Sequence, residues 1–249
     1  MSWFLLLTVI AIGLLSIAGI AALTRRGADE RRDAAALPVI MIGATAYAAL
    51  AAIGTLWSTI ATLAASQVQV ALPVRTFWPS PLPGVTDISG PTASVVSGGF
   101  SVAAVEVTGL DLTARAFLAG GIIVQGATLV VIGIVVALLC RRLLTDAPFA
   151  ASLTRSLRLA AGTLALGGIV WQALTAIGST LAANQVLRID SWAFTGDVPA
   201  GGVADTGLPE PSLAFTIEFW PILIALALVA VAAAFRTGER MQRETAGLV

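Results

Sequence analysis

Few residues of this sequence could do chemistry, because it contains no histidine and no lysine. Histidine-based metal sites and histidine general bases are therefore excluded, and neither a Gly-x-Ser-x-Gly elbow nor a Walker phosphate loop occurs. No two carboxylates fall within one apolar run, where an intramembrane acid–base pair would need them. Cys140, the single cysteine, is best interpreted as a small apolar filler. We expect no catalytic residue, no metal site and no cofactor, and a protein that is not an enzyme.

The composition indicates a membrane protein. Hydrophobic residues make up 57% of the chain, charged residues only 11%, and the mean hydropathy is +0.93. A soluble domain of this length needs about a quarter of its residues charged to cover its surface. Lipid must therefore be part of the solvent. The use of arginine for every basic residue indicates a GC-rich bacterial genome.

Five stretches of the sequence have the length and apolarity of a membrane span, which needs about 20 mostly apolar residues. They are roughly Trp3–Leu23, Leu37–Ala65, Ala116–Cys140, Leu159–Ala183 and Phe215–Phe235. The first has no basic residue before it and four arginines after it, which is typical of an uncleaved anchor with its N-terminus outside.

The distribution of arginine predicts the orientation of these spans. All but three of the 14 arginines lie in the two short links or in the C-terminal tail. Arginine-rich short segments stay on the cytoplasmic side of a membrane. We therefore expect a protein of the bacterial cytoplasmic (inner) membrane with its N-terminus outside and its C-terminus inside.

The heptapeptide TLAASQV at 62–68 returns as TLAANQV at 180–186. Each copy ends an apolar run and leads into a polar segment, which predicts two copies of a helical hairpin in the same orientation. The alternative is chance similarity between alanine-rich helices. The fold class is thus an all-α polytopic membrane protein with five transmembrane helices. Its predicted parts are an accessory helix (1–24), a cytoplasmic link (25–36), a first hairpin (37–140, outer loop 66–115), a second link (141–158), a second hairpin (159–235, outer loop 184–214) and a tail (236–249).

The outer loops are expected to form a small β-rich cap. Alternation of polar and β-branched residues predicts a strand pair between 67–72 and 98–110, and 185–189 is a further strand candidate. The proline-rich stretch 77–92 is typical of irregular loop. Trp3, Trp78, Trp192 and Trp220 fall near the outer boundary, as an interfacial aromatic belt does. A site for an aromatic ligand is the less favoured alternative.

Small residues at four-residue spacing predict a close approach of 37–65 to 159–183 at the centre of a four-helix core. Ala44, Ala48 and Ala52 form one ridge, and Ala161 and Ala165 another. Polar side chains in this core would either line a cavity or act as interhelical hydrogen-bonding groups, and the second interpretation is favoured. The candidates are Thr62, Gln125, Gln172 and Thr180.

Glu218 lies at the outer end of the last apolar run, where a carboxylate needs a partner or water. The nearest cations expected on that side are Arg115 and Arg188. We predict a structural ion pair of Glu218 with one of these arginines.

The inner face carries the most specific sequence features. Ala147-Pro148-Phe149 precedes a basic Ser156-Leu157-Arg158 helix, and the tail reads FRTGERMQRETAGLV at 235–249 with i,i+4 Glu–Arg pairs. This pattern resembles the YoaS-like bacterial membrane proteins, a family of unknown function, over roughly residues 37–249. The family looks four-helical, so the first run is a departure from it. Its members are often encoded beside a small helix-turn-helix regulator, which the resemblance implies as a possible cytosolic partner.

Three functions remain open. The first is a non-enzymatic regulatory or sensory membrane protein that engages a cytosolic partner and does not itself bind nucleic acid. The second is a small transporter or lipid- or peptide-handling protein with a polar path between the hairpins. The third is an accessory subunit bound to other membrane subunits through the first helix. The candidate partner-binding residues are Arg155, Arg158, Arg236, Arg240, Gln242, Arg243 and Glu244.

Overall fold

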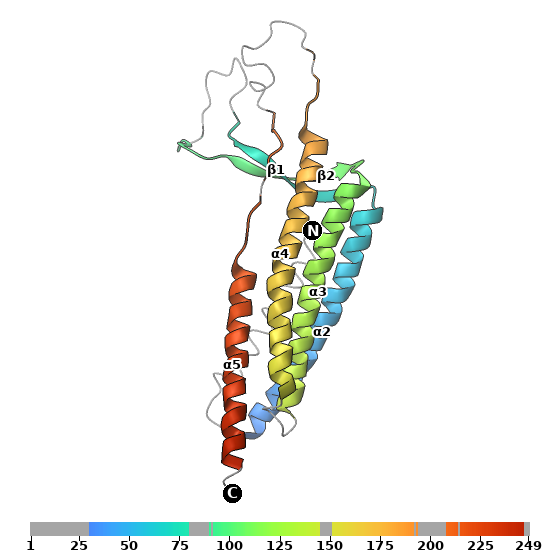
Figure 1. Cartoon of the computed structure of the whole chain (residues 1–249). Coiled ribbons are helices and arrows are strands. Elements are labelled where there is room, and N and C mark those ends of the chain that lie inside the picture. Colours follow the sequence, from blue (N-terminus) through green and yellow to red (C-terminus); the bar gives the residue numbers. More distant parts are fainter. Residues whose placement is uncertain are drawn as a thin grey trace. The chain divides into compact units, whose positions relative to one another are not determined.

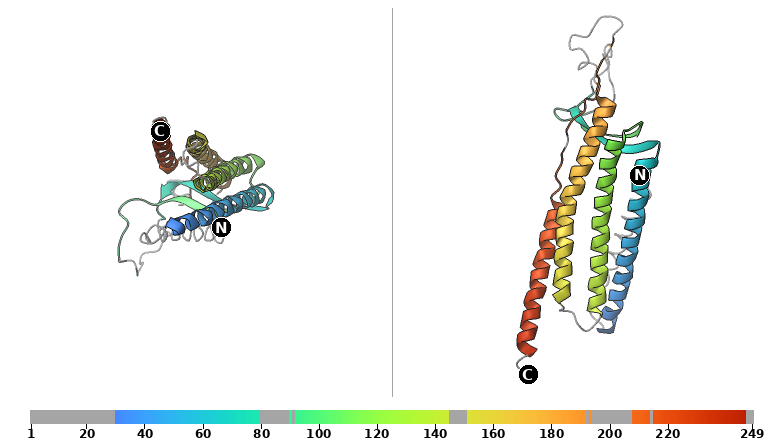
Figure 2. Two further views of the ribbon diagram at one scale, coloured as in Figure 1. Left: turned by 90° about the horizontal axis from the view of Figure 1, so that it is seen from below. Right: turned by 45° about the vertical axis from the view of Figure 1, so that its right-hand side comes forward.

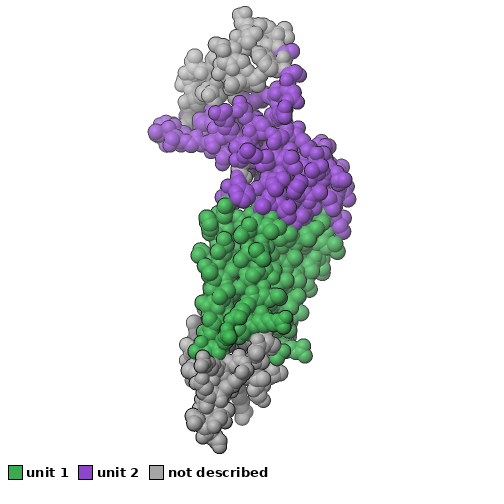
Figure 3. Space-filling model, viewed as in Figure 1, with its two compact units in different colours: residues 1–59, 121–172, 217–249 green, residues 60–120, 173–216 purple. Residues whose placement is uncertain are grey.

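The computed structural model describes residues 30–79, 90, 92–144, 151–191, 193, 208–213 and 215–246. The predicted span Trp3–Leu23 and most of the predicted loop 77–92 lie outside these residues. The chain divides into two compact units (Figure 3). Unit 1 comprises residues 1–59, 121–172 and 217–249, and unit 2 comprises residues 60–120 and 173–216.

The described chain is mostly helical, with one small sheet (Figure 1). The helices are α2 (Glu30–Ala64), α3 (Leu112–Leu143), α4 (Ala151–Leu187) and α5 (Trp220–Ala246). The strands β1 (Gln67–Phe77) and β2 (Phe100–Thr108) lie between α2 and α3 in the sequence. The predicted combination of long helices with a small β-rich part is therefore confirmed.

Three of the described helices are long and apolar enough to cross a membrane. Their apolar sections are Leu37–Ala64 in α2, Leu112–Arg142 in α3 and Thr154–Leu187 in α4. Each section contains or closely matches a run predicted from the sequence. The described structure thus supports three of the five predicted spans.

The fifth predicted span is shorter in the structure than the sequence suggested. Residues 215–219 are not helical, and α5 begins at Trp220, with Pro221 in the first turn where its missing N–H costs no hydrogen bond. The carbonyl of Phe219 accepts the first helical hydrogen bonds, from the amides of Ile222 and Leu223, each at 3.1 Å. The apolar section Trp220–Ala234 falls below the roughly 20 residues of a full span. A set of five helical spans is therefore not supported.

Glycines bring neighbouring helices of unit 1 into close contact, as small residues do in membrane helix bundles. A Cβ atom at Gly133 of α3 would lie 2.9 Å from the Cβ of Ala48 in α2, and one at Gly126 would overlap Thr55. A Cβ at Gly168 of α4 would lie 2.6 Å from the Cβ of Pro221 in α5. At each of these glycines, the backbone of one helix therefore lies directly against a side chain of its neighbour.

The predicted close approach of 37–65 to 159–183 is wrong for unit 1, because α3 lies between α2 and α4 (Figure 2). Ala44 and Ala48 face Gly133 of α3. Ala161 forms a cluster with Leu164 and Ala225 of α5 instead of facing α2. The spacing of small residues predicted which helix faces carry them, but it did not predict which neighbouring helix each face contacts.

The sheet of unit 2 has its two strands in antiparallel register. Gln67 pairs with Thr108 and Pro73 with Val102, and an irregularity then brings Phe77 opposite Phe100. This confirms the strand pair predicted from 67–72 and 98–110. Inward residues of both strands form one apolar core with the start of α3 and the end of α4. The core residues are Val68, Val70, Leu72, Val107, Leu110, Ala114, Ala182 and Ala183.

The second outer loop also contributes to the sheet, although not with the predicted residues. Val74 bridges to Pro211, the amide of Arg75 donates to the carbonyl of Glu210 at 2.9 Å, and the amide of Ser212 donates to the carbonyl of Pro73 at 3.1 Å. The predicted strand 185–189 is wrong, because α4 continues to Leu187.

The repeated heptapeptide has a different structure in each copy. In the first copy α2 ends at Ala64 and β1 begins at Gln67, whereas the second copy is helical throughout. The Asn184 side chain, which replaces Ser66, donates to the Thr180 carbonyl within the helix at 2.9 Å. In the first copy, Val68 is buried in the sheet core. The shared residues alone therefore do not decide where each helix ends: Val68 has a sheet partner in one copy, and Asn184 bonds within its helix in the other.

Candidate functional site

The junction between helices and sheet in unit 2 is held by Arg115. Its Nη1 donates to the carbonyl oxygens of Ala65 at 2.6 Å and Leu63 at 3.3 Å, and its Nε donates to that of Leu110 at 3.0 Å. The last carbonyls of a helix have no intrahelical donor and carry partial negative charge. One guanidinium from α3 therefore binds the carbonyls at the C-terminal end of α2 and the carbonyl of Leu110, just before α3.

Asp111 caps the start of α3 and joins it to the end of α4. Its Oδ1 accepts from the amide of Ala114 at 2.8 Å, and its own amide donates to Oε1 of Gln185 at 3.1 Å. Hydrogen bonding by the Gln185 side chain, and then by the Ala114 amide, holds the pKa of the Asp111 carboxyl below its usual 3.8. The ends of three helices thus meet at one polar junction beside the sheet.

This junction couples elements but has no catalytic geometry. The Arg115 guanidinium donates to backbone carbonyls, and the Asp111 carboxylate accepts from a backbone amide, which is the geometry of a helix-end contact. Within the described ranges, no three metal-ligating side chains gather that could hold an ion. The connections are short, since only residues 65–66 separate α2 from β1 and only residues 109–111 separate β2 from α3.

A second polar arrangement, in unit 1, holds the segment before α5. The Gln172 side chain accepts from the Glu218 amide at 2.6 Å and donates to the Glu218 carbonyl at 3.2 Å. It therefore acts as a peptide group would in a β-ladder. Backbone in lipid must find its partners within the protein, so Gln172 satisfies an extended residue that no helix satisfies.

The carboxylate of Glu218 is bound within the same segment. Its Oε2 accepts from the indole Nε1 of Trp220 at 2.8 Å, and the rings of Trp220 and Trp171 lie 5.7 Å apart. Glu218 is the only acidic residue of unit 1 whose side chain the structure describes. The hydrogen-bond partner of this carboxylate in the structure is thus an indole.

The predicted outer ion pair stays a prediction. Arg188 binds Asp190 at 2.9 Å, and Arg115 binds the backbone carbonyls described above. Glu218 belongs to unit 1 and both arginines to unit 2. The structure instead shows an ion pair of Arg75 with Glu210 at 3.1 Å, with side chains 77% and 51% exposed. No sequence signal points to that pair, because 135 residues separate its members.

The four polar core candidates fall in both units. Thr62 and Thr180 lie in unit 2, where Thr62 is buried. Gln125 and Gln172 lie in unit 1, with Gln125 exposed on α3 and the Gln172 amide bonded to Glu218. The Gln172 amide bonds to the non-helical residue Glu218 and to the carbonyl of Gly168 in its own helix, so the favoured role as a group that links 37–65 to 159–183 stays a prediction.

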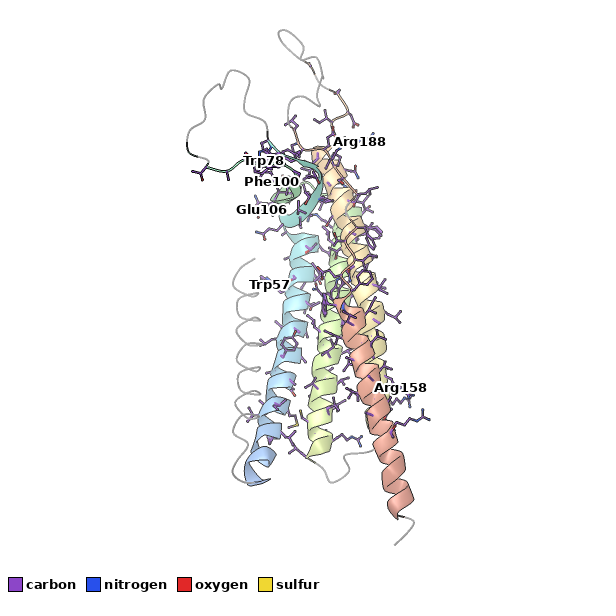
Figure 4. The ribbon with its side chains drawn as sticks, turned by 90° about the vertical axis from the view of Figure 1, so that its left-hand side faces the viewer. Trp57, Trp78, Phe100, Glu106, Arg158 and Arg188 are labelled. Atoms are coloured by element: carbon purple, nitrogen blue, oxygen red, sulfur yellow. The ribbon has the colours of Figure 1, made fainter. Side chains whose placement is uncertain are left out.

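Two aromatic residues, Trp78 and Phe100, stack at the end of the sheet. Trp78 was predicted as an interfacial residue, but its partner Phe100 was not. The two rings stack in parallel, 5.4 Å apart with an interplanar angle of 2° (Figure 4). The irregular register after Pro73 places Phe100 there.

Three helices of unit 1 each carry an exposed arginine close in sequence to one packed cluster. The cluster Val135, Leu157, Ala160 and Ala232 packs α3, α4 and α5 together. Arg141, Arg158 and Arg236 each lie within two turns of a residue in this cluster and are exposed.

The predicted partner-binding residues fall on α4 and α5. Arg155, Arg158 and Arg236 are exposed. Arg240, Gln242, Arg243 and Glu244 lie in the helical α5, and their side chains are outside the described part. The helix α5 continues through most of the predicted tail and ends at Ala246.

Comparison of the chain with protein-family models, with curated proteins and with solved structures finds no match. The structure therefore defines the class only as a mostly helical protein with three described helices long and apolar enough to span a membrane. The resemblance to YoaS-like proteins stays a prediction.

Proposed function

We propose that this chain is a non-enzymatic integral membrane protein of the bacterial cytoplasmic membrane, with a regulatory or sensory role and a cytosolic partner. The observation that carries this proposal is the composition of α5. The helix passes without a break from the apolar section Trp220–Ala234 into a polar section that reaches Ala246. A helix that continues beyond the lipid presents its polar side chains to other molecules.

The proposed topology adds residues 3–23 and the stretch from residue 215 through the apolar section of α5 to the three long apolar helices, which gives five crossings and an outside N-terminus. The composition of α3 supports this orientation. The helix begins just after β2 and ends in Arg141 and Arg142. Arginine at a span end marks the cytoplasmic side, so the sheet lies outside.

The sensory part of the proposal rests on the Arg115 junction. An event at the β1–β2 sheet reaches α2 and α3 through backbone carbonyls that one guanidinium holds together. The partner we propose is a small helix-turn-helix regulator, on the resemblance of the tail to YoaS-like proteins.

The proposal is tested by affinity purification in mild detergent, followed by mass spectrometry of the bound proteins. Full-length protein is compared with a variant lacking 240–249 and with Arg188→Gln as a matched surface change. We expect a DNA-binding protein with the full-length chain and with Arg188→Gln, and its loss with the truncation. Retention of the same partner by the truncated chain would contradict the proposal. Recovery of other membrane subunits that deletion of 1–24 releases would favour the accessory-subunit alternative.

A further inference from the structure

The exposed flank of α4 combines a pair of cations with an apolar strip. The buried face of this helix contains Thr154, Leu157, Ala160, Ala161 and Leu164. Arg155 and Arg158 lie one position after two of these residues, so both fall on the same exposed flank. Figure 4 shows Arg158 pointing outward from the helices.

The strip continues along the helix from these two arginines. Leu159 is 63% exposed and Leu166 is 68% exposed. Gly162 lies between them, and a Cβ atom there would meet nothing within 4 Å. At 1.5 Å per residue, Arg158 and Leu166 lie about 12 Å apart along the axis. This flank therefore carries two guanidinium groups followed by two exposed leucines. Gly162 leaves an open notch between the two leucines.

The position of the arginines relative to the apolar section matches the depth of lipid headgroups. The apolar section of α4 begins at Thr154. Arg155 and Arg158 therefore lie in its first turns, at the boundary between water and hydrocarbon. Guanidinium groups bind phosphate oxygens through paired, charge-assisted hydrogen bonds, and basic clusters at a span end recruit anionic lipids.

We propose that this flank of α4 binds one anionic phospholipid. The phosphate lies against Arg155 and Arg158, and an acyl chain lies along Leu159, Gly162 and Leu166. The proposal goes beyond the proposed function, because it needs no protein partner and can be tested on the purified chain alone.

The test measures the thermal unfolding midpoint of the full chain in detergent during titration with phosphatidylglycerol, phosphatidylcholine or inorganic phosphate. We expect a saturable rise in the midpoint with phosphatidylglycerol only. Arg155→Gln combined with Arg158→Gln should weaken the apparent affinity roughly tenfold or more, because two cation–phosphate contacts are lost. Arg188→Gln, just beyond the opposite end of α4, is the matched control and should leave the affinity unchanged.

A second variant separates the acyl-chain site from the headgroup site. Gly162→Leu fills the notch without touching either arginine, and it should also weaken the response to phosphatidylglycerol. An equal response to phosphatidylcholine would overturn the proposal, as would an equal response to inorganic phosphate. Unchanged phosphatidylglycerol affinity in the double arginine variant would overturn it too.

Discussion

At the residue scale, single polar side chains hold together backbone ends that the sequence shows only as helix boundaries. Composition was enough to predict a membrane protein, and polar residues within or beside apolar runs singled out Arg115, Gln172 and Glu218. Their partners were not predictable, because Arg115 and Gln172 bind backbone groups 46 to 52 residues away. Which carbonyl or amide comes within reach depends on tertiary packing, and backbone atoms leave no signature in side-chain patterns.

Replacement of Arg115 by glutamine should destabilise the protein measurably. The variant loses charge-assisted hydrogen bonds to the carbonyls of Leu63, Ala65 and Leu110, each of which is worth about 1.5–3 kcal/mol in general. We expect a total loss of about 2 kcal/mol, because water replaces part of these bonds at a half-exposed site. The measurement is the free energy of unfolding by denaturant in detergent.

The control for this prediction is Arg188→Gln. Arg188 and its partner Asp190 have side chains 70% and 78% exposed, and exposed ion pairs contribute about 0–1 kcal/mol. Equal destabilisation by the two variants would show that Arg115 has no special role at the junction.

The capping role of Asp111 predicts a dependence of stability on pH. The folded protein holds the pKa of this carboxyl below its usual 3.8, so the charged form is favoured in the fold. The stabilisation is therefore complete above about pH 5 and is lost as the pH falls through the lowered pKa. Asp111→Asn keeps a good cap but has no proton to bind. We expect its unfolding midpoint to fall less steeply between pH 5 and pH 3 than that of the original protein, and parallel curves would refute the assignment.

At the element scale, the sequence predicted which segments are helical more reliably than it predicted where they end or what they pack against. The runs for α2, α3 and α4 follow from apolarity alone. Two nearly identical heptapeptides, however, end one helix and continue another, because Val68 enters a sheet core while Asn184 bonds within its own helix. The start of α5 was also placed too early, since residues 215–219 alternate apolar and polar side chains but gave no sign of an extended backbone held by Gln172.

The glycine contacts of unit 1 predict which substitutions disturb the packing of α2 on α3. Alanine is normally favoured over glycine within a helix by up to about 1 kcal/mol. At Gly126 the added methyl group would overlap Thr55, so Gly126→Ala should destabilise by about 1–3 kcal/mol despite that preference. Gly162→Ala meets open space and should be neutral or stabilising. Thermal unfolding in detergent distinguishes the two, and equal midpoints would argue against close contact of α2 with α3.

The bond of Gln172 to the backbone of Glu218 predicts local protection at the start of α5. Gln172→Leu removes both hydrogen bonds to this residue at similar volume. A loss of about 1.5 kcal/mol from the two hydrogen bonds together corresponds to roughly a tenfold change in an opening equilibrium. We therefore expect amide hydrogen exchange at 217–219 to speed up about tenfold, measured by mass spectrometry. The matched control Gln125→Leu, on the exposed face of α3, should leave this segment unchanged.

At the scale of the whole molecule, the central claim is that the sheet and the polar end of α5 lie on opposite sides of a membrane. The claim follows from the arginines that end α3 and continue α5, and from the strands that directly follow α2 and precede α3. Sequence alone predicted this orientation, because the sorting of arginine by compartment does not depend on tertiary contacts.

The most direct test of this claim is cysteine accessibility in intact bacterial cells that express the protein. Cys140 is replaced by alanine, and Ser101→Cys on β2 or Thr237→Cys on α5 supplies the single thiol; both positions are exposed. A membrane-impermeant maleimide should label Ser101→Cys in intact cells and Thr237→Cys only after the cells are permeabilised. Labelling of Thr237→Cys in intact cells, or protection of Ser101→Cys until permeabilisation, would contradict the proposed topology and the cytosolic role of α5 with it.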